Sequence, residues 1–142
     1  MSNPAEQPTS GADFIRQFFP HSPYVGHLGM RLTEMQPGMA TLTLPFTEAL
    51  VTIGTVVHGG AIASLIDTAA MVAAWSEGEI PAKARGTTVN LSVVYLSAAQ
   101  QEDLRAVARV LRCGRNLVYL DVEVTGASGN AVAKGLVTYK PG

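Results

Sequence analysis

An apolar run from Val56 to Trp75 constrains the fold of this chain more than any other segment, because Asp67 is its only charged residue. Two adjacent glycines, Gly59 and Gly60, open the longer part of the run. The residues that follow are rich in Ala, Leu and Met and too many for a usual strand, so they predict a helix over 61–76. Nearly every side of this helix is apolar, and such a helix has to be buried. The central carboxylate argues against a membrane span, since a charge is costly in lipid.

Strand-like segments flank the predicted helix on both sides. Before it, residues 39–46 alternate apolar and polar side chains, and Pro37-Gly38 predicts the turn that joins them to the preceding strand. After it, four segments rich in Val, Leu, Thr and Tyr are separated by short turns, which is typical of an antiparallel meander. The sequence therefore predicts an α+β fold in which one curved antiparallel sheet, helped by a second subunit, covers one long helix. The expected elements are a helix at 12–19, a loop at 21–23, and strands at 28–35, 39–46, 87–97, 104–112, 117–125 and 131–139.

Length and composition point to a single domain. The chain has 142 residues, and its net charge of −1 gives no general attraction to nucleic acid or to an anionic membrane. Residues 1–11 are polar and hold two prolines, so we expect a disordered lead-in rather than a secretory signal, followed by one domain over 12–142. The single cysteine, Cys113, excludes an internal disulfide, and we expect a cytoplasmic protein.

The segment from His58 to Asp67 carries the features that predict chemistry. Gly59 and Gly60 sit at the expected helix start, where backbone N–H groups are free and the helix dipole is positive. Glycines let a ligand approach the backbone closely, as an oxyanion or anion site requires. A carboxylate on an apolar helix is costly to bury unless it is paired or useful. Two interpretations stay open for Asp67, a catalytic group or a structural one bonded to a neighbouring hydroxyl, and His58 can equally close a loop.

The spacing of Gly59 and Asp67 adds a constraint. The two residues are eight positions apart, which is ~12 Å along a helix at a rise of about 1.5 Å per residue. One carbonyl group cannot touch the Gly59 N–H and the Asp67 carboxylate of the same chain. Either one of them acts alone, or a two-fold axis places Asp67 of one chain opposite Gly59 of its partner.

The His-Gly-Gly segment at 58–60, followed after six residues by Asp67, resembles the signature of hotdog-fold acyl-CoA thioesterases of the PaaI (phenylacetate-degradation) type. The resemblance continues in residues 86–97, 114–116 and 132–135, and covers nearly all of 24–140. It implies a sheet wrapped around a central helix, homodimers or homotetramers with shared sites, and hydrolysis of acyl- or aryl-CoA thioesters to the free acid and CoA. No cofactor is implied, and three separated histidines with one cysteine form no known metal-ligand pattern.

The resemblance also assigns roles by position. The Gly59 N–H would polarise the thioester carbonyl, His58 would order the loop or assist there, and Asp67 would be the general base or the nucleophile. Gly60 would contact substrate, and Thr88 falls where related enzymes carry a hydroxyl that helps to position water. Related enzymes often have Asn six residues before the histidine; here that position is Thr52, which has a shorter reach and no amide.

Further residues are candidates for binding the CoA part and the acyl part of the substrate. CoA phosphates favour basic side chains, and Arg115 in the Cys-Gly-Arg-Asn turn is the leading candidate, although a solvated surface charge is the simpler interpretation.

Two rival functions remain, an acyl-CoA-binding module without catalysis and a hotdog acyl-CoA hydratase or dehydratase. Further candidates are Arg85, Arg112 and Lys134 for CoA, and Met71, Trp75, Leu91 and Val93 for the acyl group, the last four being equally good core residues.

Overall fold

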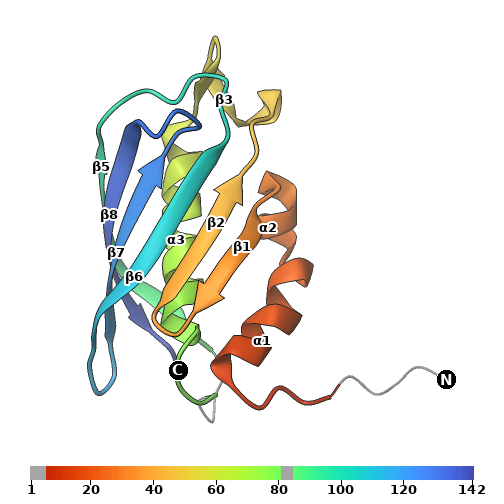
Figure 1. The fold of residues 1–142 in the computed structure, drawn as a ribbon, viewed down its shortest axis with the longest axis vertical. Helices are drawn as coiled ribbons and strands as arrows, with labels where there is room; N and C mark the ends of the chain where they lie inside the picture. The colour runs from red at the N-terminus through yellow and green to blue at the C-terminus, as the bar shows by residue number, and fades with distance from the viewer. Residues whose placement is uncertain (1–5, 81–84) are drawn as a thin grey trace, which may run out of the picture.

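A six-stranded antiparallel sheet lies against one long helix, α3 (Gly59–Trp75), in the computed structural model, which describes residues 6–80 and 85–142. The strand order is β1-β2-β6-β7-β8-β5, and Figure 1 shows the sheet curving around α3. The predicted α+β fold, an antiparallel sheet wrapped around a central helix, is therefore confirmed. The strands are β1 (Arg31–Gln36), β2 (Met39–Leu44), β5 (Thr87–Tyr95), β6 (Leu104–Cys113), β7 (Val118–Thr125) and β8 (Ala131–Lys140).

The core lies between the concave face of the sheet and α3. Along β7, buried and less buried residues alternate strictly, as expected for a strand with one face on the core. The buried side chains of α3 supply the other half of the core, and Leu65 and Ile66 are fully buried. Apolar side chains that recur every two residues in the strands and every 3.6 residues in the helix therefore pack together in one continuous layer.

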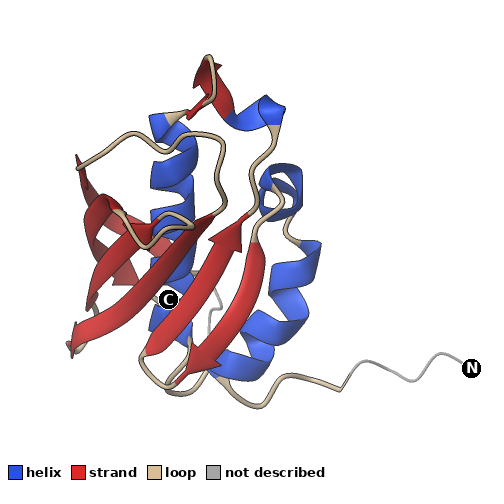
Figure 2. Ribbon diagram, turned by 45° about the horizontal axis from the view of Figure 1, so that its top comes forward, coloured by secondary structure: helices blue, strands red, loops and turns tan. Residues whose placement is uncertain are grey.

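The sheet covers α3 on one side only, as both ribbon views show (Figure 2). The residues of α3 on the other side recur every three or four positions and are half-buried or exposed. A helix that looks apolar nearly all round in sequence thus keeps one open face. This open face consists of Gly60, Ala63, Ser64, Asp67, Thr68 and Met71.

The N-terminal helix α1 (Gly11–Phe18) begins one residue before the predicted start. The Ser10 side chain caps it by accepting a hydrogen bond from the Asp13 N–H at 3.1 Å. Of the predicted lead-in 1–11, residues 1–5 lie outside the described part of the chain, and the last two residues belong to this cap and helix.

Two short elements were not predicted. A second helix, α2 (Pro23–Leu28), follows a 3₁₀ turn at Phe19–His21, so the predicted loop at 21–23 and strand start at 28 are wrong. Pro23 at the first helical position and Gly29 at its end (φ 77°) are helix boundary signals, but the helix that they bound has only six residues. The second element is a hairpin of β3 (Val51–Ile53) and β4 (Val56–Val57), too short to show an alternating pattern.

Within the described residues, no helix is long and apolar enough to cross a membrane.

Close contact between α3 and the sheet depends on Gly135 in β8. A Cβ atom at this position would lie 2.5 Å from Cγ2 of Ile66, which is fully buried. We expect Gly135→Ala to lower the free energy of unfolding by about 1–3 kcal/mol, because the added methyl group forces α3 away from the sheet. Urea denaturation at fixed protein concentration measures the change.

Gly26→Ala is the matched control, because a Cβ at this helical position of α2 meets nothing within 4 Å. It should be neutral or stabilising by about 0.5–1 kcal/mol. Equal stabilities for the two variants would contradict the close approach of α3 and β8.

Candidate active site

The N-terminus of α3 is held by His58. Its Nδ1 atom accepts a hydrogen bond from the Gly60 N–H at 2.8 Å, which makes His58 the N-cap of the helix. In the neutral ring the hydrogen is then on Nε2, so this exposed side chain keeps one donor. The Gly60 N–H already donates to His58 and is not available to a ligand. The missing side chain of Gly60 would still let a ligand lie close to its Cα.

Gly59 presents a different arrangement. The Tyr95 hydroxyl at the end of β5 donates a hydrogen bond to the Gly59 carbonyl at 2.7 Å, and a Cβ on Gly59 would lie 3.3 Å from the Tyr95 ring. No described residue accepts a hydrogen bond from the Gly59 N–H, which lies at the positive end of the helix dipole. This N–H is therefore a free donor on a fixed backbone. The sequence does not predict this role of Tyr95, since its contact with Gly59 spans 36 positions and leaves no local signal.

Asp67 lies on the open face of α3 and is half-buried. The Thr88 hydroxyl on β5 donates a hydrogen bond to its Oδ1 at 2.6 Å. The pairing of β5 with β8 shifts register just after Thr88. The structure thus brings together two residues that the sequence selected 21 positions apart, and it leaves Oδ2 of the carboxylate without a protein donor among the described residues.

Both side chains line a cavity of about 480 Å³ between α1, α3, β5 and the end of β8. Inside it, Trp75 Nε1 donates a hydrogen bond to the Tyr139 hydroxyl at 2.9 Å. Burial raises the pKa of Tyr139, and the charge of Asp67 adds to this effect while the Trp75 hydrogen bond opposes it. Tyr139 therefore remains a neutral hydroxyl beside the carboxylate. The cavity is lined by Phe14, Phe18, Asp67, Thr68, Met71, Trp75, Arg85, Gly86, Thr87, Thr88 and Tyr139.

Among the described residues of one chain, Gly59 and Asp67 line different cavities. Gly59 lines a separate hollow of about 370 Å³ together with Thr52 and Tyr95. Thr52 is exposed on β3, next to the N-terminus of α3. Gly59 and Asp67, the two ends of the motif, therefore line two different cavities, as their separation along the helix requires.

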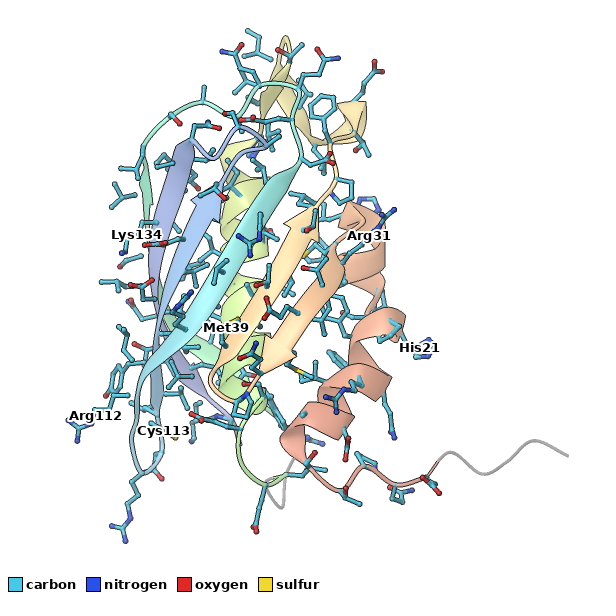
Figure 3. The ribbon with its side chains drawn as sticks, viewed as in Figure 1. His21, Arg31, Met39, Arg112, Cys113 and Lys134 are labelled. Atoms are coloured by element: carbon cyan, nitrogen blue, oxygen red, sulfur yellow. The ribbon has the colours of Figure 1, made fainter. Side chains whose placement is uncertain are left out.

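Of the basic candidates for CoA, Arg85 lines the Asp67 cavity, and the others lie elsewhere. Arg115 is in the turn between β6 and β7 and lines a cavity of about 290 Å³, which includes Trp75 but not Asp67 or Gly59. Figure 3 shows Arg112 and Cys113 beside this turn at the lower end of the molecule. Lys134 is on the outer face of the sheet, 3.2 Å from Asp121, and this hydrogen bond raises the pKa of its ammonium group.

Metal ligands are not gathered in the described part of the chain, where no three His, Cys, Asp or Glu side chains form a group that could hold an ion.

The sequence and the fold of this chain match those of known proteins. A family model described as the thioesterase superfamily matches residues 54–133, which include the His58 cap, all of α3 and strands β5 to β7. The chain belongs to the thioesterase superfamily. The medium/long-chain acyl-CoA thioesterase YigI of Escherichia coli is 29% identical to it over 88% of this chain and 89% of that protein. Membership supports hydrolase activity.

Solved structures of this superfamily share the fold. A thioesterase family protein from Silicibacter pomeroyi is 28% identical and superposes with a TM-score of 0.84, over 92% of this chain and 96% of that one. The E. coli PaaI protein from the phenylacetic acid degradation operon superposes with a TM-score of 0.80 over 92% and 93% at 20% identity, which supports the fold alone. The predicted hotdog fold is thereby confirmed.

The role of His58 as a cap can be separated from a chemical role. We expect His58→Ala to lower the free energy of unfolding by about 0.5–2 kcal/mol, because the Gly60 N–H loses its acceptor. His58→Asn should retain most of this stability, since Asn is a good N-cap. Thermal or urea unfolding measures both variants.

The activity of His58→Asn then decides the role. Thioester hydrolysis within about threefold of the wild type would assign His58 to the cap alone, and a loss of about 10²-fold in a stable variant would assign it to the reaction as well.

Proposed function

We propose that this protein is an acyl-CoA thioesterase of the PaaI type, with Asp67 as its catalytic carboxylate. The hydrogen bond from Thr88 to Asp67 at the wall of a partly apolar cavity carries the proposal. It fixes one carboxylate oxygen and leaves the other for a water molecule or a carbonyl carbon. A carboxylate held in this way on the open face of a buried helix suits catalysis better than packing.

The reaction follows from these groups. Asp67 takes a proton from water, the water oxygen bonds to the thioester carbonyl carbon, and the carbonyl electron pair moves to its oxygen. The resulting oxyanion is stabilised by the free N–H of Gly59. When the tetrahedral species collapses, the carbon–sulfur bond breaks and the CoA thiolate takes the proton. Direct attack by Asp67 is the alternative, with water hydrolysing the resulting anhydride.

The two groups meet only if a second subunit contributes. Strand β5 is an edge of the sheet, and an unpaired edge with apolar residues is a surface that proteins normally cover. The open face of α3 adjoins this edge through the Thr88–Asp67 bond. We place a two-fold axis here, so that Asp67 faces the partner's Gly59. The exposed apolar residues of this edge and the loop after it are Val89, Leu91, Val94, Tyr95 and Leu96.

The remaining candidates have supporting roles in this proposal. Thr52 lies beside Gly59 and supplies a hydroxyl in place of the amide common in related enzymes. Gly60 allows substrate to pass close to the backbone. Arg115 is the proposed contact for the CoA phosphates, since its cavity borders the Asp67 cavity at Trp75.

Removal of the Asp67 charge tests the activity. We expect Asp67→Asn to lower kcat for CoA release by about 10²-fold or more, because no other described carboxylate lines the cavity. A panel of phenylacetyl-, hydroxybenzoyl-, hexanoyl- and palmitoyl-CoA provides the substrates. Asp121→Asn is the control, since Asp121 is bound to Lys134 on the outer face and should change kcat little.

Other outcomes would favour the rival functions. CoA binding without release from any thioester would favour the binding module, and conversion of enoyl-CoA without CoA release would favour a hydratase.

Mixing two inactive variants tests the shared site. Asp67→Asn removes the carboxylate, and Gly59→Val adds a side chain that crowds Tyr95 and the approach to the Gly59 N–H, so we expect each variant to disable every site of its own homodimer. In a mixed dimer one site receives both intact residues, so random exchange should restore about a quarter of wild-type activity. The same variants, co-expressed and purified together, are assayed for CoA release. If the two groups act within one chain, mixing restores no activity.

A further inference from the structure

We propose that helix α1 sets the acyl-chain length that the active site accepts, and that Phe18 is the residue that limits it. This inference rests on the proposed thioesterase function, because it takes the cavity at Asp67 as the space for the acyl group.

One stripe of α1 faces the core, which anchors the helix. Ile15 is fully buried, and the Gly11 N–H donates a hydrogen bond to the Gly78 carbonyl at 3.3 Å. A Cβ at Gly11 would collide with the carbonyl oxygen of Trp75. The start of α1 is thus held against the end of α3, and its position relative to the cavity is set by packing rather than by a loose loop.

The neighbouring stripe of α1 faces the cavity. Phe14 and Phe18 are one turn apart and stack on each other, with ring centroids 5.6 Å apart and planes inclined by 8°. Phe14 also stacks on Trp75 at 4.8 Å. The three rings form a continuous aromatic wall, whose inner end is fixed by the hydrogen bond from Trp75 to Tyr139.

The opposite side of the same cavity carries the reactive groups, Asp67 and Thr88. Figure 1 shows α1 and β5 on opposite sides of α3, so the cavity runs across the open face of the helix. An acyl group whose carbonyl lies at Asp67 therefore points its tail along the aromatic wall toward α1. Phe18 is 43% exposed and forms the outer end of this wall, between the cavity and solvent.

Except for Trp75, the aromatic rings that line this cavity lie outside the segment that the family model matches. The family match spans residues 54–133, whereas Phe14 and Phe18 precede it and Tyr139 follows it. The reactive groups Asp67 and Thr88 lie in the matched segment, whereas Phe14 and Phe18, which close the outer end of the cavity, do not. Variation in α1 can therefore change the accepted acyl group without disturbing the catalytic groups.

The test is a chain-length profile of kcat/KM for butanoyl-, hexanoyl-, decanoyl- and palmitoyl-CoA. Phe18→Ala opens the outer end of the cavity, and we expect the decanoyl to butanoyl ratio of kcat/KM to rise about tenfold, because the opened end admits the additional methylene groups of the longer chain. Phe18→Trp closes the same end further and should lower this ratio. Leu111→Ala is the control, because Leu111 is another exposed apolar residue (60%), on β6, that does not line the cavity, and its ratio should stay that of the wild type.

Binding of the non-hydrolysable thioethers S-decyl-CoA and S-butyl-CoA, measured by calorimetry, separates this inference from the proposed function. If the wild type hydrolyses no thioester but Phe18→Ala shifts the ratio of the two Kd values about tenfold toward S-decyl-CoA, the thioesterase proposal fails and the role of Phe18 stands. If hydrolysis occurs and the chain-length ratio is unchanged or lower in Phe18→Ala, the role of Phe18 is overturned.

Discussion

The packing of α3 against only one face of the sheet is the constraint on which the rest of this structure depends. The sheet buries Leu65 and Ile66 completely, and Gly135 lets the helix approach closely enough to do so. The same packing leaves a stripe of small and polar residues uncovered on the other side of the helix. Asp67 can be held on a buried helix at moderate desolvation cost because it lies on this stripe.

Strand β5 links this packing to the chemistry. As the last strand of the sheet it lies next to the open face of α3, where it supplies Thr88 to the Asp67 carboxylate and Tyr95 to the Gly59 carbonyl. Both ends of the helix motif are therefore oriented by hydroxyl groups from one edge strand. The N-terminus of α3 is fixed further by His58, so that the Gly59 N–H is left as a donor without a protein partner among the described residues.

Local patterns explain what the sequence predicts correctly, and long-range contacts explain what it does not predict. The pattern of apolar and polar side chains along consecutive residues predicts the helix at 61–76 and the strands after it. The structure confirms these elements within a few positions. The cost of burying a charge leaves two interpretations open for Asp67, a catalytic group or a structural one bonded to a hydroxyl, and only the resemblance points to Thr88. The contacts of Tyr95 and the position of Phe18 over the cavity could not be predicted, since each joins segments far apart in the chain. Helix α2 and the β3–β4 hairpin are too short for a periodic signal.

The position of Trp75 has an optical consequence. It is the only tryptophan of the chain, it is 4% exposed, and it combines a hydrogen bond to Tyr139 with a stacked Phe14 ring. Indole emission responds to the polarity around the ring, and one wall of the Asp67 cavity is this ring. The protein therefore carries a built-in fluorophore at the place where a ligand of this cavity would displace water, and its emission reports, without any label, on ligands of this cavity and of the adjoining Arg115 cavity.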